Sequence, residues 1–157
     1  MEVLIPNILT DSEIVQILDF AAVSFHHDDD GGHSVTCKPN HLPAVAERAF
    51  ARMTRDLPHT FQGVDPWMKF YRLGGKANGT VLPHMDEDFR CPNGHLSTWS
   101  VLFYLGGDYE GGETVFEGSR VISHPDRGSV LVFPHKIIHE GKPVINGTKF
   151  VLKTDLY

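Results

Sequence analysis

The sequence has few cysteines, no long apolar run and no concentration of basic side chains. Only Cys37 and Cys91 are present among 157 residues, and they do not form a CxxC pair. The sequence therefore predicts neither a disulfide framework nor a thiolate zinc site. No apolar run approaches the roughly 18 to 20 residues that a membrane-spanning helix needs, so we expect no membrane segment.

Basic charge is scarce as well. The chain has 14 Lys and Arg against 20 Asp and Glu, which gives a formal net charge of -6, and its basic residues are scattered. A nucleic-acid-binding surface normally requires a basic patch, so we expect no nucleic-acid partner. The first residues, Met1 to Pro6, lack the basic start of a secretory signal, which favours a cytoplasmic location.

What the chain does contain suits one compact domain. With 41% hydrophobic content it can bury one core, so we predict a single domain over 1–157. A helical scaffold is predicted at about 10–58. Thr10 and Glu13 form a capping box at the start of its first helix, and Pro43 suits the first turn of its second helix.

The remainder of the chain, about 67–157, is predicted to be a β core. It consists of short runs rich in Val, Phe, Tyr and Thr, separated by Gly, Pro and Asn. No helical stretch separates these runs, so we expect mainly antiparallel sheets and a two-sheet jelly roll. The predicted strands are 67–73, 81–86, 97–105, 113–116, 120–123, 129–133, 137–144 and 148–156.

Ten histidines and twenty acids make chance metal-like pairs frequent, so the setting of each pair decides its meaning. Four His-x-acid matches occur, beginning at His26, His27, His84 and His124. Random order predicts about 1.3 such matches for this composition. The first two lie in the polar stretch 26–33, which fits a solvated loop better than a calcium site. The match at His124 lies in a turn that contains Pro, Asp and Gly.

His84 and Asp86 differ from the other matches because they lie two residues apart on a predicted strand. That spacing places both side chains on one face. A third candidate, His139, lies on a later predicted strand. Two imidazoles and one carboxylate form the ligand set of non-haem Fe(II) oxygen chemistry. Glu87 and Asp88 are alternative carboxylates, but Glu87 points to the opposite strand face and Asp88 lies where the strand should end.

Lys149 follows His139 by ten residues, and the Asn146-Gly147 pair between them predicts a hairpin. A two-residue turn would place Lys149 on the opposite sheet face from His139. A three-residue loop over 145–147, with Gly147 as the left-handed bulge residue, would place both side chains on the same face. We predict the bulged hairpin, and hence a Lys149 ammonium that faces the metal ligands.

Together these motifs make the sequence resemble the prolyl 4-hydroxylase-like branch of the 2-oxoglutarate and Fe(II)-dependent oxygenases. The resemblance covers about 67–157. The motifs that carry it are Tyr71, His84-Met85-Asp86, Gly111-Gly112-Glu113-Thr114-Val115-Phe116, Gly128-Ser129 with Phe133, His139, Pro143-Val144, Gly147 and Lys149. The resemblance implies a double-stranded β-helix in which His84, Asp86 and His139 bind Fe(II).

The same resemblance implies contacts to the co-substrate. Lys149 is expected to pair with the distal carboxylate of 2-oxoglutarate, and Thr114 is expected to donate a hydrogen bond to it, with Tyr71 assisting. Two features depart from the family pattern. The interval from Tyr71 to His84 is longer than usual, and the last strand carries Phe150 to Asp155 where many relatives have a tryptophan.

The implied activity is that of a dioxygenase that uses Fe(II), 2-oxoglutarate and O2 to hydroxylate an unactivated C–H bond, with ascorbate as a candidate reductant. A peptidyl proline, a free amino acid and another small metabolite stay open as substrates. Loops at 25–38, 73–80 and 89–96 are expected to form the rim of the substrate pocket. A cupin-like metal hydrolase or isomerase and a non-catalytic jelly-roll binding module are the alternatives, which Lys149 and Thr114 together disfavour.

Overall fold

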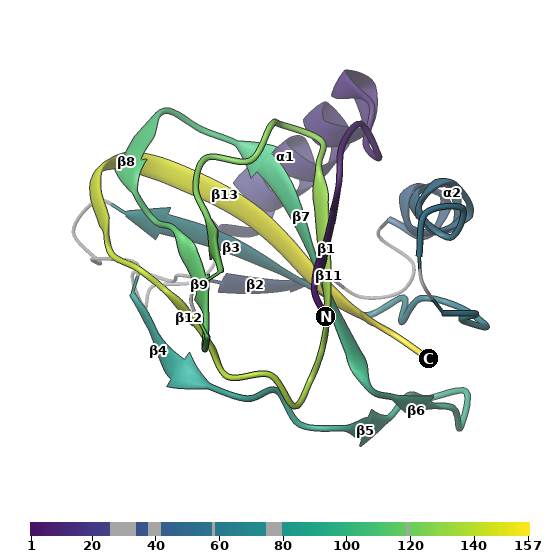
Figure 1. The fold of residues 1–157 in the computed structure, drawn as a ribbon. Coiled ribbons are helices and arrows are strands. Elements are labelled where there is room, and N and C mark those ends of the chain that lie inside the picture. The colour runs from purple at the N-terminus through teal and green to yellow at the C-terminus, as the bar shows by residue number, and fades with distance from the viewer. Residues whose placement is uncertain (26–33, 38–41, 58, 75–79, 119) are drawn as a thin grey trace.

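The computed structural model describes residues 1–25, 34–37, 42–57, 59–74, 80–118 and 120–157. The polar stretch 26–33 lies outside the described residues, so the solvated-loop interpretation stays a prediction. Two helices and a β core make up this part of the chain (Figure 1). Of the helices that the structure describes, none has both the length and the apolar character to cross a membrane.

The two helices come early in the chain, and β-strands dominate the rest of it. The helices are α1 (Asp11–Phe25) and α2 (Pro43–Met53). The strands are β1 (Val3–Ile5), β2 (Ser34–Cys37), β3 (Met68–Gly74), β4 (Val81–His84), β5 (Phe89–Arg90), β6 (Leu96–Ser97), β7 (Trp99–Gly106), β8 (Tyr109–Gly111), β9 (Thr114–Phe116), β10 (Val121–Ile122), β11 (Val130–Pro134), β12 (His139–Gly141) and β13 (Val144–Leu156). Each predicted strand overlaps an observed one, but β4 ends at His84 and not at Asp86, and Val144 begins β13 and does not end β12. The structure adds five short strands that were not predicted, β1, β2, β5, β6 and β8.

The start of α1 follows from the capping box that the sequence predicts. The backbone N–H of Thr10 donates to the Glu13 carboxylate at 2.9 Å, and the Glu13 N–H donates to the Thr10 hydroxyl at 3.3 Å. The buried Glu13 carboxylate also accepts hydrogen bonds from Arg48 and Arg52 at 2.6 to 2.8 Å. Both arginines lie on α2, so one carboxylate caps the first helix and joins it to the second.

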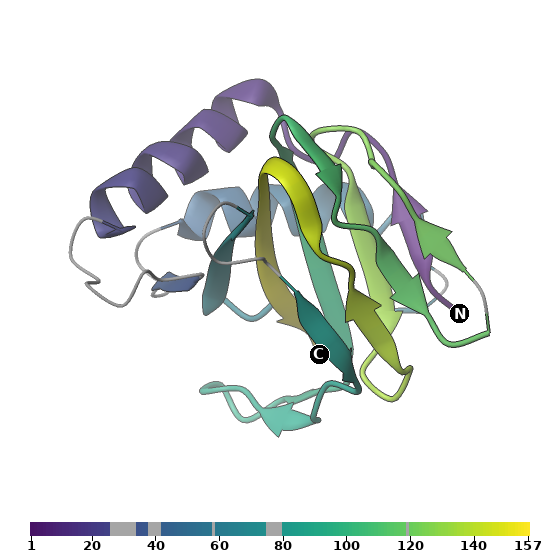
Figure 2. The same ribbon diagram turned by 90° about the vertical axis from the view of Figure 1, so that its left-hand side faces the viewer.

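Two antiparallel sheets form the β core. The larger sheet has the strand order β1-β11-β7-β13-β3-β2, and the smaller sheet has the order β10-β9-β12-β4. The smaller sheet lies on one side of the larger sheet, and the helices lie on the other (Figure 1). Figure 2 shows the smaller sheet in front and α2 at the back. The mainly β, antiparallel jelly roll that the sequence predicts is confirmed.

The larger sheet borders a different core on each face, because side chains alternate along its strands. The core on the helix side includes Ile14, Ile17, Met53, Phe70, Phe103 and Leu152. The core between the sheets is smaller and contains Tyr104, Phe116, Ile122, Leu131, Phe133 and Val151. The space that this smaller core leaves between the sheets holds the pocket described below.

The path of β13 corrects the predicted hairpin. The chain does not reverse at Asn146 and Gly147 but continues as one strand from Val144 to Leu156. The first part of β13 pairs with β8, and the part from Thr148 onward pairs with β3 and then β7. Gly147 does have the predicted left-handed conformation, with φ of 78°. The glycine therefore sits in a strand that passes from β8 to the larger sheet, not in a tight turn.

Long-range pairing explains this difference. The Asn-Gly signal is local, whereas the backbone after Gly147 finds partners on a distant segment: the Thr148 N–H donates to the Asp108 carbonyl at 2.9 Å. The backbones approach so closely that a Cβ on Gly147 would lie 1.9 Å from the Asp108 oxygen. Only glycine fits there.

We predict that Gly147→Ala lowers the free energy of unfolding by about 2 kcal/mol or more, because the new Cβ is strained by its φ and meets backbone. Gly94→Ala is a matched control. Gly94 has φ of 87°, but no atom lies within 4 Å of its added Cβ, so we expect a loss of only about 1 kcal/mol. Urea denaturation measures both losses. Equal losses would contradict the close approach at Gly147.

Candidate metal centre and adjoining pocket

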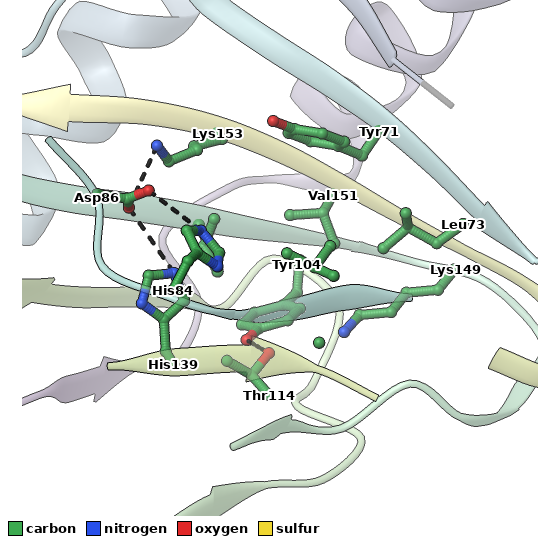
Figure 3. A pocket seen from close by; sticks show the side chains of 13 residues that line it. Tyr71, Leu73, His84, Asp86, Tyr104, Thr114, His139, Lys149, Val151 and Lys153 are labelled. Atoms are coloured by element: carbon green, nitrogen blue, oxygen red, sulfur yellow. Dashed lines mark hydrogen bonds and ion pairs between the residues drawn. The ribbon is translucent and has the colours of Figure 1, made fainter. Parts of the chain in front are cut away.

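Three side chains that can ligate a metal meet at one end of the smaller sheet. His84 ends β4, Asp86 follows it, and His139 begins β12. β4 and β12 pair so that His84 lies directly opposite His139. One ligand atom of each of the three residues lies within 4.8 Å of the others. The structure thus brings together the three residues that the sequence selects as metal ligands (Figure 3).

The two imidazoles are oriented in the same way. Nδ1 of His84 lies 2.8 Å from the Leu82 carbonyl oxygen, and Nδ1 of His139 lies 3.0 Å from the Ile137 carbonyl oxygen. A carbonyl can only accept, so in each neutral ring Nδ1 carries the proton and Nε2 keeps its lone pair. The two Nε2 atoms lie 3.5 and 3.8 Å from oxygens of Asp86. Lone pairs and a carboxylate that converge in this way suit a divalent cation between them.

Asp86 is held by donors on the larger sheet. The Ser100 hydroxyl donates a short hydrogen bond to Oδ2 of Asp86, and the Lys153 ammonium lies 3.3 Å from the same oxygen. Burial raises the pKa of Asp86, but Lys153 and the Ser100 hydrogen bond outweigh it and hold the pKa below its ordinary value. Asp86 is therefore ionised at neutral pH, as a metal ligand must be.

His139 is the more enclosed of the two histidines. Its side chain is 8% exposed against 40% for His84. Its ring packs against Phe133 at a centroid distance of 4.6 Å. Burial lowers the pKa of His139, which favours the neutral imidazole that binds metals. The candidate centre is therefore closed on the His139 side and accessible on the His84 side.

The alternatives to Asp86 are directed elsewhere. Glu87 is exposed, and Oδ1 of Asp88 lies 3.2 Å from Nδ1 of His135. His135 is fully buried, and its Nε2 lies 3.0 Å from Asp155. His135 and Asp88 therefore serve a buried polar network next to the centre, and neither is part of the three-residue ligand group.

The remaining described His-x-acid match is structural, as the sequence predicts. His124 has φ of 45° in a turn, and its ring stacks on Tyr109 at a centroid distance of 5.1 Å. His95 is likewise part of the turn after Cys91 and stacks on Tyr157 at 4.8 Å.

A pocket of about 160 Å³ extends from the three ligands between the two sheets. All six residues that the sequence proposes for metal and co-substrate line it: Tyr71, His84, Asp86, Thr114, His139 and Lys149. The pocket walls between the polar ends are mainly apolar, with Leu102 and Val151 among them.

Lys149 lies at the opposite end of the pocket from Asp86 (Figure 3). Its side chain points inward and is 4% exposed, so the prediction for its orientation holds although the predicted hairpin is wrong. Its ammonium donates to the Gly112 carbonyl at 2.5 Å and lies 5.2 Å from the centroid of the Tyr104 ring. Burial lowers the pKa of Lys149 to about 8. No carboxylate of the described chain forms an ion pair with it, so this end of the pocket favours an anion.

Tyr104 is a pocket residue that sequence reasoning missed. Its hydroxyl lies 3.0 Å from the Thr114 hydroxyl, beside the Lys149 ammonium. Burial raises the pKa of Tyr104 well above its ordinary value, so the hydroxyl keeps its proton and can donate. In the sequence, Tyr104 looks like one more core residue of an apolar strand. Its place in the pocket follows from strand pairing: Tyr104 lies opposite Val151, and both side chains face the space between the sheets.

Tyr71 lines the same pocket from β3. Its hydroxyl points toward the Lys153 side of the pocket and away from Lys149 (Figure 3). Burial, together with the negative charges of Asp86 and Asp155, raises the pKa of Tyr71 to about 12. The contact between Tyr71 and the distal carboxylate stays a prediction.

Comparison with known proteins gives a family match. Residues 68–154, more than half of the chain, match the family model described as the 2OG-Fe(II) oxygenase superfamily. A PKHD-type hydroxylase from Gloeothece citriformis is 37% identical over 81 residues, which cover 49% of this chain and 36% of the relative. The chain thus matches well under half the length of that curated relative.

Solved structures share the fold over nearly the whole chain. A viral collagen prolyl hydroxylase from Paramecium Bursaria Chlorella virus-1, solved as a 2-oxoglutarate complex, is 19% identical with a TM-score of 0.70 and covers 99% of this chain and 94% of its own. A prolyl-4-hydroxylase from Pseudomonas putida is 13% identical with a TM-score of 0.69 and covers 99% and 91%. At these identities the likeness shows the fold.

We predict that His84 and His139 are Nδ1–H tautomers in the metal-free protein at about pH 8, where an ordinary histidine is neutral. The two carbonyl contacts fix this tautomer. His124 is an internal control, because its Nε2 lies 3.3 Å from the Tyr109 carbonyl and favours the opposite tautomer. Long-range proton–nitrogen correlation spectra distinguish the two forms. An Nε2–H signal from His84 or His139 would contradict the geometry described here.

Proposed function

The chain belongs to the 2-oxoglutarate and Fe(II)-dependent oxygenase superfamily, and on this premise we propose that it is a dioxygenase that hydroxylates an unactivated C–H bond. The observation that carries the proposal is the pocket between the sheets. At one end it has two imidazoles and a carboxylate, and at the other end it has a buried lysine without a carboxylate partner among the described residues. A metal alone would need only the first end, whereas a metal with a bound dicarboxylate uses both.

The donor set fits Fe(II), which two histidines and one carboxylate bind while leaving positions open. His84 and His139 would bind through Nε2, and Asp86 through one carboxylate oxygen. Together with 2-oxoglutarate and O2, the iron supplies oxidative decarboxylation to succinate and CO2 and the transfer of a hydroxyl group to the substrate.

The contacts of Asp86 favour metal binding through one of its two carboxylate oxygens. Ser100 and Lys153 both contact Oδ2. Oδ1 lies 3.5 Å from Nε2 of His84 and has no donor on the larger sheet. Contacts of this kind fix the orientation of a ligating carboxylate before the metal arrives, which improves both affinity and geometry.

Lys149, Tyr104 and Thr114 form the proposed site for the distal carboxylate of 2-oxoglutarate. One ammonium and two hydroxyl groups converge there in a buried place. A charge-assisted hydrogen bond is strong in such a place because little water competes for it. The apolar walls of the pocket keep water from the co-substrate chain.

The substrate class rests on the relatives. Both of the solved structures described above are prolyl hydroxylases by name, so a peptidyl proline is the first candidate, and a free amino acid or small metabolite is the second. We retain ascorbate as the candidate reductant that keeps the iron ferrous. A cytoplasmic location and the absence of a nucleic-acid partner also stay proposals.

We predict that His139→Ala lowers the affinity for Fe(II) by more than about 100-fold, because a ligand is lost in a centre where even supporting contacts are worth 10- to 100-fold. His95→Ala is the control, since His95 stacks on Tyr157 away from the pocket. Anaerobic calorimetry measures both affinities. Unchanged Fe(II) binding by His139→Ala would exclude His139 as a ligand.

We predict that Lys149→Ala raises the 2-oxoglutarate concentration needed for half-saturation at least about tenfold, because the carboxylate loses a charged hydrogen bond. Fe(II) affinity should stay unchanged. The weak visible charge-transfer band of the anaerobic Fe(II)–2-oxoglutarate complex reports the binding.

Lys142→Ala is the control for this variant. The exposed Lys142 pairs with Glu140 at 2.7 Å, outside the pocket.

If the unaltered protein gives no band and forms no succinate that depends on oxygen, the proposed activity is wrong.

A further inference from the structure

An open groove of about 480 Å³ adjoins the proposed metal pocket. Tyr71 and Lys153 line both the groove and the pocket. β3, β5 and β13 border the groove, and each contributes one basic residue to its lining: Lys69, Arg90 and Lys153. Lys153 connects the groove to the candidate centre, because its ammonium lies 3.3 Å from Asp86 (Figure 3).

Two of these cations face each other across one β ladder. Lys69 on β3 and Lys153 on β13 are Cα partners in the antiparallel pairing, and both line the groove. Side chains in such positions have Cβ atoms about 4.5 to 5.5 Å apart, and like charges there are unfavourable. An anion between the two ammonium groups would remove this repulsion.

The two lysines differ in the partners that the protein gives them. Lys153 lies 3.3 Å from Asp86 and 3.8 Å from Asp155. Lys69 is exposed, its ammonium lies 5.6 Å from the centroid of the Tyr71 ring, and no described carboxylate pairs with it. The negative charge of Asp86 now partly neutralises Lys153. A divalent ion bound to Asp86 would compete for that charge, so the repulsion between the two lysines would grow when the metal is bound.

Arg90 adds a third positive charge from β5. Its guanidinium donates to the Gly94 carbonyl at 3.2 Å, and within the described chain no acidic side chain forms an ion pair with it. The whole chain has a net charge of -6. Lys69 and Arg90 thus add positive charge that no described carboxylate pairs, and such a local field attracts anions.

The acidic residues in the groove lining are already occupied. Asp65 is buried and accepts the Trp67 N–H at 3.0 Å, and Asp155 is buried with its Oδ1 3.0 Å from Nε2 of His135. The groove surface also contains the exposed aromatic side chains Trp67 and Phe89. It therefore offers positive charge beside apolar surface.

We propose that this groove binds the molecule to be oxidised and that Lys69, Lys153 and Arg90 recognise a carboxylate on it. The proposal rests on the proposed dioxygenase function, since the groove matters only as the access to that centre. Lys153 contacts the ligand Asp86, so the recognised carboxylate lies within a few bonds of the oxidised carbon. The α-carboxylate of a free amino acid and the side chain of an aspartyl or glutamyl residue in a peptide both have this chemistry.

Matched pairs of acids and amides test the proposal. Free amino acids are compared with their amides, and N-acetylated tripeptides that contain Asp or Glu are compared with those that contain Asn or Gln. Succinate formation is measured in air with Fe(II) and 2-oxoglutarate. We expect acids to have KM values at least about tenfold below those of their amides, as one charged hydrogen bond predicts. The set that is turned over identifies the source of the carboxylate.

Variants locate the effect in the groove. Lys69→Gln should raise KM for the preferred acid about tenfold and change KM for its amide little, and Lys69→Arg should restore the preference. Arg55→Gln is the control, because Arg55 is exposed and lines neither the groove nor the pocket. Its KM values should equal those of the unaltered protein.

The charge-transfer band separates the two proposals. If the band forms but no acid exceeds its amide, in turnover or in calorimetric titration of the anaerobic complex, carboxylate recognition is wrong and the dioxygenase function stands. An acid preference that survives in Lys69→Gln overturns the role of this groove. If the band does not form and no oxygen-dependent succinate is produced, both proposals fail together.

Discussion

The alternation of side chains along β13 is the constraint on which the rest of the site depends. This strand pairs with β8, β3 and β7, and its two faces border different cores. Phe150 and Leu152 pack on the helix side, while Val151 packs between the sheets. A shift of one residue would reverse both sets. The hydrophobic packing therefore fixes the face on which Lys149 and Lys153 lie.

That constraint gives the two ends of one pocket opposite charge requirements: the Lys149 end favours an anion, and the Asp86 end favours a cation. Burial of the Lys149 ammonium costs free energy that an anion would offset, and convergence of Asp86 with two imidazole lone pairs costs free energy that a cation would offset. The fold maintains both unfavourable groupings because strand pairing fixes the backbone positions of His84, His139 and Lys149. Ligands that bind only to the folded pocket should in turn stabilise the fold.

Local patterns in the sequence account for much of this site. Spacing along a predicted strand selects His84 and Asp86, although β4 ends at His84, and capping chemistry locates the start of α1. Features that depend on distant pairing could not be predicted. Asn146-Gly147 signals a reversal, but β8 supplies partners that let the strand continue. Likewise, only the register between strands shows that Tyr104 borders the pocket.

Asp86 links the proposed metal centre to the proposed substrate groove, because its carboxylate faces both the histidines and Lys153. Without a metal, the carboxylate neutralises much of the Lys153 charge. A bound divalent cation draws that negative charge toward itself, so less of it neutralises Lys153 and more of the Lys153 charge attracts a substrate carboxylate. Coupling of this kind is reciprocal, so a substrate carboxylate in the groove must also strengthen metal binding. The groove would then hold its substrate most tightly when the centre is ready to oxidise it.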